Sequence, residues 1–237
     1  MLKLYQFPRP KPSSVPNFSP FCVKLETYLK MAEIPYESKP TFDFSKSPKN
    51  LMPYIEIDGQ FKGDSALIID FLKEKYGDKI DSELSAEQQA IATGFIGMLE
   101  NHLGPFVFYF RWVDNEGWPQ FREMIFAKSP KLIKLLVGYQ LSKKAAKRMH
   151  LQGTSRFTQD EMLYLAQKDL NALSVYLADK SFFFGDKPTL LDIVCFAVYS
   201  GIIFVPIETK LKQLAIASQF ANLQQHSKRM LEKFYSN

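Results

Sequence analysis

The first part of the chain alternates between strand-like and helix-like patterns. Leu2–Phe7 alternates apolar and polar side chains, which is typical of a half-buried strand, and Pro8 ends it. Ser19 then stands as an N-cap before Pro20, which favours a helix to about residue 32. Apolar side chains at three- and four-residue spacing predict its inward face, namely Phe21, Leu25, Tyr28, Leu29 and Ala32. A second strand from residue 34 would complete a parallel strand–helix–strand unit.

A hairpin and a further helix follow this unit. Pro53–Ile57 and Gln60–Lys62 are separated by Asp58-Gly59, a pair that tolerates the positive φ of tight turns. Asp64-Ser65 then opens a helix that Gly77 ends. We expect its inward face to carry Leu67, Ile68, Phe71 and Leu72. The element order is therefore βαβ–ββα.

From residue 85 onward the pattern predicts helices only. The capping box Ser85–Gln88 begins a helix through His102, which Gly104-Pro105 is expected to break or kink. Further helices are predicted over 129–149 and 158–178, and Thr189 with Asp192 forms a second capping box before the most apolar helix. Residues 78–83 are polar and fit a linker. We therefore expect an α/β domain over 1–77 and an all-helical domain over 85–237.

Composition and charge narrow the class of protein. The 237 residues are 46% hydrophobic and 23% charged, with a net charge of +5, which is ordinary globular composition. Basic residues form no run of five or six, so no nucleic-acid partner is expected. Cys22 and Cys195 lack the spacing of a disulfide framework or metal site. The uncharged stretch 193–207 is shorter than the ~20 residues that span a bilayer. We expect a cytoplasmic protein with no transmembrane segment and no metal.

Four strings, in this order along the chain, point to a family. They are Ser19-Pro20-Phe21-Cys22 at the first helix start, Leu51–Ile55 before the hairpin, Asp64–Ile68 at the next helix start, and Gly185–Ile193. Together they resemble the glutathione transferase superfamily, which implies a thioredoxin-like N-terminal domain and an all-helical C-terminal domain. Within it the chain is most similar to the divergent failed-axon-connections and metaxin-like branch. The long loop Pro8–Phe18 and the expanded segment Ser129–Arg156 are shared with that branch.

The resemblance implies where glutathione would bind. Ser65, at a helix N-terminus, offers N–H groups and a hydroxyl to the γ-glutamyl carboxylate, and Asp64 can receive the ammonium group. Met52 would align the peptide backbone before Pro53, which the resemblance implies is cis. The alternatives are that Asp64 or Ser65 only caps its helix and that Pro53 is an ordinary proline at a strand start.

The resemblance also places Ser19 as the catalytic residue, whose hydroxyl would stabilise the glutathione thiolate. Its alternative is N-capping alone. Cys22 occupies the second cysteine position of a redox motif whose first position is here serine, so a dithiol cycle is excluded. We expect the thiol of Cys22 to be buried and structural. Cys195, in the apolar helix, is expected to pack in the core.

The leading hypothesis is a glutathione transferase-like enzyme that joins glutathione, as co-substrate, to a small apolar electrophile. A homodimer is a possible assembly. Arg9 and Lys11 would cover the thiol site or contact a carboxylate. Tyr109, Arg111 and Trp112 either line the electrophile site or belong to an aromatic core. The alternative is a non-catalytic, metaxin-like adaptor that keeps the fold for protein interactions. A third hypothesis is a thiol reductase acting through Cys22.

Overall fold

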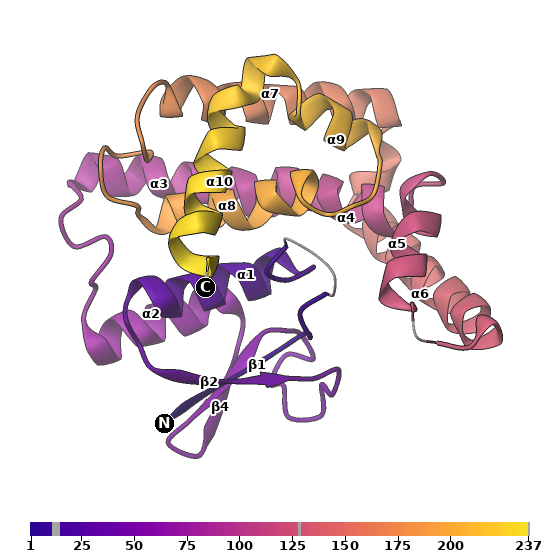
Figure 1. The fold of residues 1–237 in the computed structure, drawn as a ribbon, viewed down its shortest axis with the longest axis horizontal. Helices are drawn as coiled ribbons and strands as arrows, with labels where there is room; N and C mark the ends of the chain where they lie inside the picture. The colour runs from indigo at the N-terminus through magenta and orange to yellow at the C-terminus, as the bar shows by residue number, and fades with distance from the viewer. Residues whose placement is uncertain (11–14, 128, 237) are drawn as a thin grey trace.

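A computed structural model describes residues 1–10, 15–127 and 129–236. A four-stranded sheet of order β2-β1-β3-β4 forms the base of the molecule (Figure 1), with β1 parallel to β2 and β3 antiparallel to β1 and β4. Two helices, α1 and α2, cover the same face of it. The elements are β1 (Leu2–Gln6), α1 (Pro20–Met31), β2 (Tyr36–Pro40), β3 (Tyr54–Ile57), β4 (Gln60–Gly63) and α2 (Ser65–Tyr76). The expected βαβ–ββα order is confirmed.

Burial on the two helices follows the expected faces with two exceptions. Leu25, Tyr28 and Leu29 of α1 are fully buried against the sheet. Phe21 is 43% exposed and Leu67 is 53% exposed, so their placement in the core was wrong. Both side chains stand in the first turn of their helix, at the edge where the strands end and no longer cover the helix.

The rest of the chain is helical, as expected. It contains α3 (Ala86–Met98), a π-helical turn (Leu99–Leu103), α4 (Gly104–Trp112), α5 (Gly117–Ile125), α6 (Lys131–Leu151), α7 (Gln159–Leu177), α8 (Leu190–Ile203), α9 (Lys210–Ala215) and α10 (Ala221–Tyr235), with 3-10 turns at Thr154–Arg156 and Ser218–Phe220. Of the expected break or kink at Gly104-Pro105, a break is absent, and a π-helical turn stands directly before these two residues instead. The N–H of Gly104 donates to the Leu99 carbonyl across the wider π-helical turn, and the chain stays helical through Pro105, which lacks an N–H.

The N-terminal α/β part (β1 to α2) and the C-terminal helical part (α3 to α10) share a hydrophobic core. Helix α8, almost entirely buried, packs against α1, and α10 packs against α8. Phe182, Ile193, Phe196 and Met230 join the same cluster as the buried residues of β1, α1 and α2. No helix among the described residues has both the length and the apolar character needed to cross a membrane.

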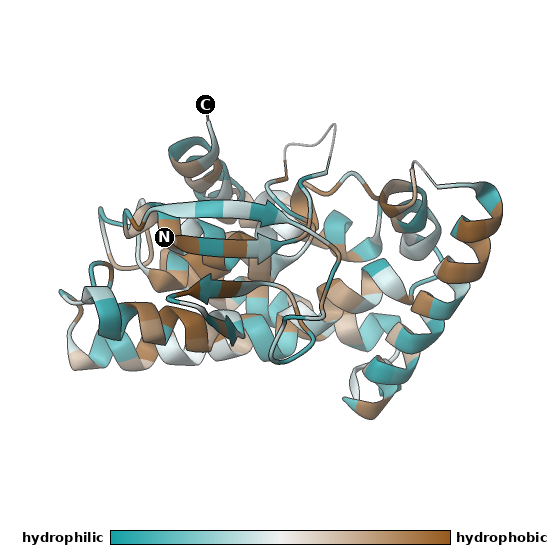
Figure 2. Cartoon of the chain, turned by 90° about the horizontal axis from the view of Figure 1, so that it is seen from below, coloured by the Kyte–Doolittle hydropathy of each residue, from teal (hydrophilic) through white to brown (hydrophobic). Residues whose placement is uncertain are grey.

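Helices α5 and α6 project from the body of the molecule, at the right of Figures 1 and 2. Helix α6 lies close to α5 at Gly138, where a Cβ atom would meet the side chain of Arg122. The inner face of α6 also buries Ala145 and Met149. Its outer face is turned to solvent.

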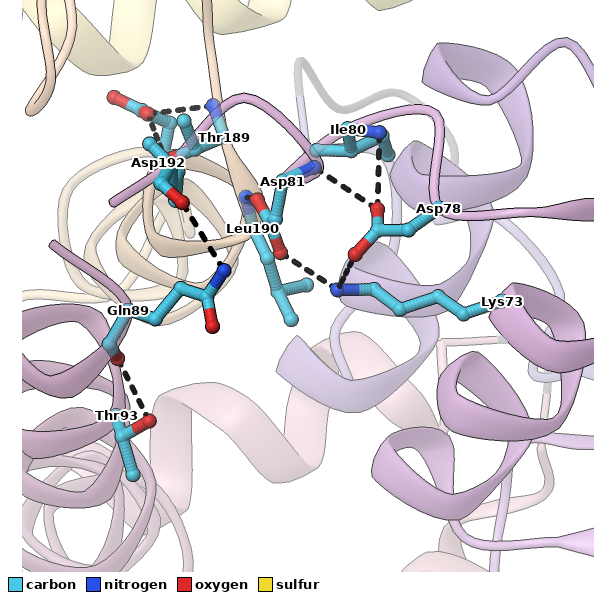
Figure 3. A network of polar contacts seen from close by, with 10 residues as sticks. Lys73, Asp78, Ile80, Asp81, Gln89, Thr93, Thr189, Leu190 and Asp192 are labelled. Carbon is cyan, nitrogen blue, oxygen red and sulfur yellow. Dashed lines mark hydrogen bonds and ion pairs between the residues drawn. The ribbon is translucent and has the colours of Figure 1, made fainter. Parts of the chain in front are cut away.

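The linker between the two parts is held by a polar network (Figure 3). Lys73 of α2 lies 2.8 Å from Asp78 and 2.7 Å from Asp81. Asp81 in turn accepts the N–H of Leu190, the first residue of α8, at 3.0 Å. Lys73 therefore connects α2, through the linker, to the start of α8.

Candidate glutathione site

Sheet topology brings the sequence-predicted site residues to the edge of the sheet at which β1 and β4 end and β3 begins. In the strand register Tyr5 lies opposite Tyr54, and Tyr54 opposite Gly63. Ser19 lies on the connection that leaves this end of β1, the Met52–Pro53 bond comes just before β3, and Asp64 comes just after β4. Adjacent strands are roughly 4.8 Å apart, so the edge from β1 to β4 spans roughly 10 Å. An extended tripeptide is of the same length.

The start of α2 offers unused hydrogen-bond donors. Asp64 caps the helix, because its Oδ1 accepts the N–H of Ala66 at 3.0 Å and that of Leu67 at 3.3 Å. The expected capping alternative is thus present. Ser65 is mostly buried, and neither its N–H nor its hydroxyl has a hydrogen-bond partner among the described residues. These two donors at a helix N-terminus suit a carboxylate.

Asp64 itself has a rare backbone conformation. Its φ of 77° and ψ of 119° lie outside the left-handed helical region and are costly for a residue with a Cβ atom. Such strain is typical of functional sites, where surrounding structure holds it. Here it turns the chain sharply from β4 into α2 and fixes the direction of the Ser65 N–H.

The Met52–Pro53 peptide bond is cis, which confirms the conformation implied by the resemblance. Met52 is buried, and its backbone N–H and C=O make no hydrogen bond within the described part of the chain. Both groups therefore remain available to an extended peptide beside β3.

Ser19 is the N-cap of α1. Its backbone is extended, and its Oγ accepts the N–H of Cys22 at 3.4 Å, so the capping alternative is present here too. Capping uses a lone pair and leaves the hydroxyl proton for donation to a ligand. Asn17 positions the residue: its Oδ1 accepts the Ser19 N–H at 3.0 Å, and its amide donates to the Phe7 carbonyl at 2.7 Å. The sequence reasoning missed Asn17, although an Asn two residues before a cap is a recognisable turn signal.

Arg111 brings a buried positive charge next to Ser19. Its Nη1 donates to the Phe18 carbonyl at 2.6 Å, on the peptide that joins Phe18 to Ser19, and its Nη2 donates to the Gly201 carbonyl. It has no carboxylate partner among the described residues, and burial lowers the pKa of its guanidinium to about 10. Arg111 was expected to line the electrophile site or join the core. The structure places it between the Ser19 loop and the end of α8.

Two other groups near this edge are unsuited to activating a thiol. Burial raises the pKa of the Cys22 thiol to about 12, against the opposing effect of hydrogen bonds with the Phe7 backbone and the Ser19 side chain. The expectation of a buried thiol at Cys22 is confirmed, and Cys195 is buried as well. The Tyr5 hydroxyl donates to Glu56 at 2.8 Å, and this hydrogen bond raises its pKa to about 12.

Val15 and Phe18, in the described part of the first loop, form a wall beside the site. Val15 is buried with Trp118 and Phe121 of α5, and Phe18 packs edge-on against Phe121. Trp112 stacks on Trp118 in the same cluster, so it belongs to the core alternative. Arg9 lies 3.4 Å from the carboxylate of Glu26 of α1, which agrees with the second of its two expected placements. Lys11 lies outside the described residues.

Comparison with known proteins places this chain in a family. The model of the glutathione S-transferase N-terminal domain matches residues 20–117, and that of the C-terminal domain matches residues 166–230. Isoprene-epoxide glutathione S-transferase of Rhodococcus sp. (strain AD45) is 34% identical, over 75% of this chain and 77% of that protein. The chain belongs to the glutathione S-transferase family.

Two further relatives place the chain in a divergent branch of that family. Failed axon connections of Drosophila melanogaster is 36% identical over 84% of this chain and 50% of that protein, so this chain spans half of its length. Metaxin-3 of Xenopus laevis is 27% identical over 88% of this chain and 71% of that protein. Among solved structures, glutathione transferase Omega 3C from Trametes versicolor matches with a TM-score of 0.58 and 16% identity, covering 99% of this chain and 86% of that one. That likeness shows the fold.

Proposed function

We propose that the chain binds glutathione along the sheet edge and joins its thiolate to a small apolar electrophile. The observation that carries this is the placement of three unused sets of hydrogen-bonding groups in a row: the Ser19 hydroxyl proton, the backbone of Met52, and the N–H and hydroxyl of Ser65. They match, in order, the thiol, the cysteinyl backbone and the γ-glutamyl end of the tripeptide. The similarity to an isoprene-epoxide glutathione S-transferase supports the same activity.

The proposed chemistry needs a thiolate at neutral pH. A free thiol has a pKa near 8.5 and is mostly protonated at that pH. Donation from the Ser19 hydroxyl, the N-terminal end of α1 and the buried charge of Arg111 all favour the ionised sulfur. The thiolate then attacks the electrophilic carbon, the sulfur–carbon bond forms, and the leaving group or opened epoxide oxygen takes the electron pair.

Calorimetric titration with glutathione tests the proposal. We expect binding at millimolar concentration or better, weakened at least tenfold in Ser65→Ala, which removes a donor to the carboxylate. Ser82→Ala, in the exposed linker, is the matched control. Absence of heat at millimolar glutathione in the native protein would contradict glutathione binding.

A non-catalytic adaptor is the second candidate function. The observation that favours it is the wall formed by Val15 and Phe18, which pack against α5 beside Ser19 where an electrophile would approach. The similarity to metaxins supports this alternative. It predicts a protein partner and no glutathione conjugation. Affinity capture and an assay with epoxide substrates distinguish it from the first proposal.

We also propose a cytoplasmic location and a homodimer. The two buried cysteines, neither of which forms a disulfide, support the cytoplasmic location.

A further inference from the structure

Helix α6 exposes an apolar surface at its projecting end. Leu132, Leu136 and Tyr139 are 67%, 59% and 63% exposed, and Ile133, Leu135 and Val137 are also exposed. Six large apolar side chains within eight residues form a patch of the kind that marks an interaction site. Figure 2 shows hydrophobic residues along the outer end of this helix.

The patch is separate from the packing of α6 onto the body. Its inner face is occupied at Gly138, Ala145 and Met149, which are buried, and Ser142 donates to the Trp112 carbonyl at 3.1 Å. The helix is thus fixed in place by contacts that leave the patch in solvent.

A cationic surface continues the same stripe toward the other end of α6. Leu132, Leu136 and Tyr139 are followed at helical spacing by Lys143 and Lys147, all on the outer face. The helix holds six basic and no acidic residues, more positive charge than the net +5 of the whole chain. The acidic partner of Lys134 is Glu123 of α5. The other five basic side chains, those of Lys131, Lys143, Lys144, Lys147 and Arg148, make no ion pair among the described residues.

We propose that this outer face of α6 docks on the surface of an anionic lipid bilayer. A stripe that changes from apolar to cationic along its length matches the bilayer, where acyl chains lie below negatively charged headgroups. With the projecting end of α6 pointing into the bilayer, the apolar part, from 132 to 139 and about 10 Å long, fits within the ~5–10 Å depth that interfacial helices reach. A second copy of this chain is a poorer match, because it would bring a second set of cations and no carboxylates from α6.

Vesicle co-sedimentation tests this docking surface. The native protein should bind phosphatidylcholine vesicles that contain phosphatidylserine, and should not bind vesicles of phosphatidylcholine alone. The triple variant Lys143→Gln, Lys144→Gln, Lys147→Gln should bind about 100-fold more weakly, since each basic residue near an anionic surface contributes about fivefold. The double variant Leu132→Gln, Leu136→Gln should also lose binding. Raising the salt from about 0.1 M to about 1 M should release the native protein.

Matched controls use exposed residues of other helices. The triple variant Lys168→Gln, Lys210→Gln, Lys228→Gln removes the same charge, and Val175→Gln removes an exposed aliphatic side chain of α7; both should bind like the native protein. Binding that is unchanged in the α6 variants, or equal on both kinds of vesicle, would overturn the proposal. So would light scattering that shows a dimer dissociated by Leu132→Gln, Leu136→Gln, because a second copy would then cover the patch.

Discussion

At the residue scale, the Ser19 hydroxyl of the proposed site can accept one hydrogen bond and donate another. The Ser19 Oγ accepts the Cys22 N–H at 3.4 Å, a long hydrogen bond, while its proton stays available. Capping and thiolate stabilisation can therefore coexist in Ser19, and they are separable by measurement.

Replacing Ser19 by Ala tests the proposed catalytic role. We expect glutathione to bind nearly as before, since most contacts go to the peptide ends, while the pKa of the bound thiol rises toward its free value. Turnover at neutral pH should fall about tenfold for each 1.36 kcal/mol of thiolate stabilisation that the substitution removes. Ultraviolet thiolate absorbance against pH measures the pKa. Ser19→Thr, which keeps a hydroxyl, is the control, and superimposable titrations of native protein and Ser19→Ala would contradict the role.

Asp192 is a capping residue whose burial increases its contribution to stability. Its carboxylate is fully buried and contacts the Thr189 N–H at 2.7 Å, the Thr189 hydroxyl at 2.8 Å, the Phe183 N–H at 3.0 Å and His226 Nε2 at 2.9 Å. The capping box was expected from the sequence; the contacts with Phe183 and His226 were not. The residue therefore connects the start of α8 to α10.

Replacing Asp192 by Ala should lower the free energy of unfolding by about 3–5 kcal/mol, because it leaves several buried donors unpaired. Thr158→Ala, in the exposed capping box of α7, is the comparison and should cost about 1 kcal/mol. Urea unfolding of both variants provides the measurement. Equal losses would show that the buried contacts add nothing to the cap.

At the element scale, the linker network joins α2 to α8. Burial opposes ionisation of Asp78, but hydrogen bonds from the Asp81 backbone, Lys73 and the Ile80 backbone outweigh it, so its pKa is lowered. Burial likewise opposes the charge on Lys73, and its hydrogen bonds with Asp78 and Asp81 raise its pKa. Both shifts favour the charged pair that Figure 3 shows.

This network predicts how stability depends on acid. A carboxyl whose pKa is lower in the folded state contributes stability above its unfolded pKa of about 3.9, and the contribution is lost as the pH falls through the folded pKa. As the pH is lowered from about 5 to about 2, the unfolding free energy of Asp78→Asn should therefore fall less than that of the native protein. Urea unfolding across that range measures it. In Lys73→Gln the Asp78 carboxyl, followed by NMR, should titrate at higher pH; an unchanged titration would contradict the pairing.

At the scale of the whole molecule, α8 belongs to the cores of both parts. Phe196 and Ala197 pack with the α1 cluster, while Val194, Cys195 and Val198 pack with α3, α4 and α7. Lys24 of α1 also pairs with Glu100 of the π-helical turn at 2.7 Å. The two parts are therefore expected to unfold together.

Replacing Phe196 by Ala tests this coupling. The side chain is fully buried, so the variant should lose about 3–5 kcal/mol of unfolding free energy. Far-UV circular dichroism and fluorescence of Trp112 and Trp118 should still report one coincident transition. Phe157→Ala, at an exposed position, should change stability by less than about 1 kcal/mol. Separate transitions by the two probes would contradict a shared core.

The sequence by itself determined the features that depend on near neighbours. The Asp58-Gly59 turn and the capping boxes at Ser85 and Thr189 each rest on contacts within three or four residues. The five candidate site residues were also named from sequence, through local strings. Such features are readable because the interacting groups are adjacent in the chain.

Only the tertiary structure decided the features whose partners are distant in the chain. Arg111 binds carbonyl oxygens 93 and 90 residues away, and His226 lies 34 residues from Asp192. Helical periodicity placed Phe21 and Leu67 inward, yet the ends of the strands left both exposed. Burial and long-range hydrogen bonding depend on how elements pack, which a local pattern does not contain. The sequence thus determined the turn, the helix caps and the candidates for the site, and packing determined which of their groups lack a hydrogen-bond partner among the described residues.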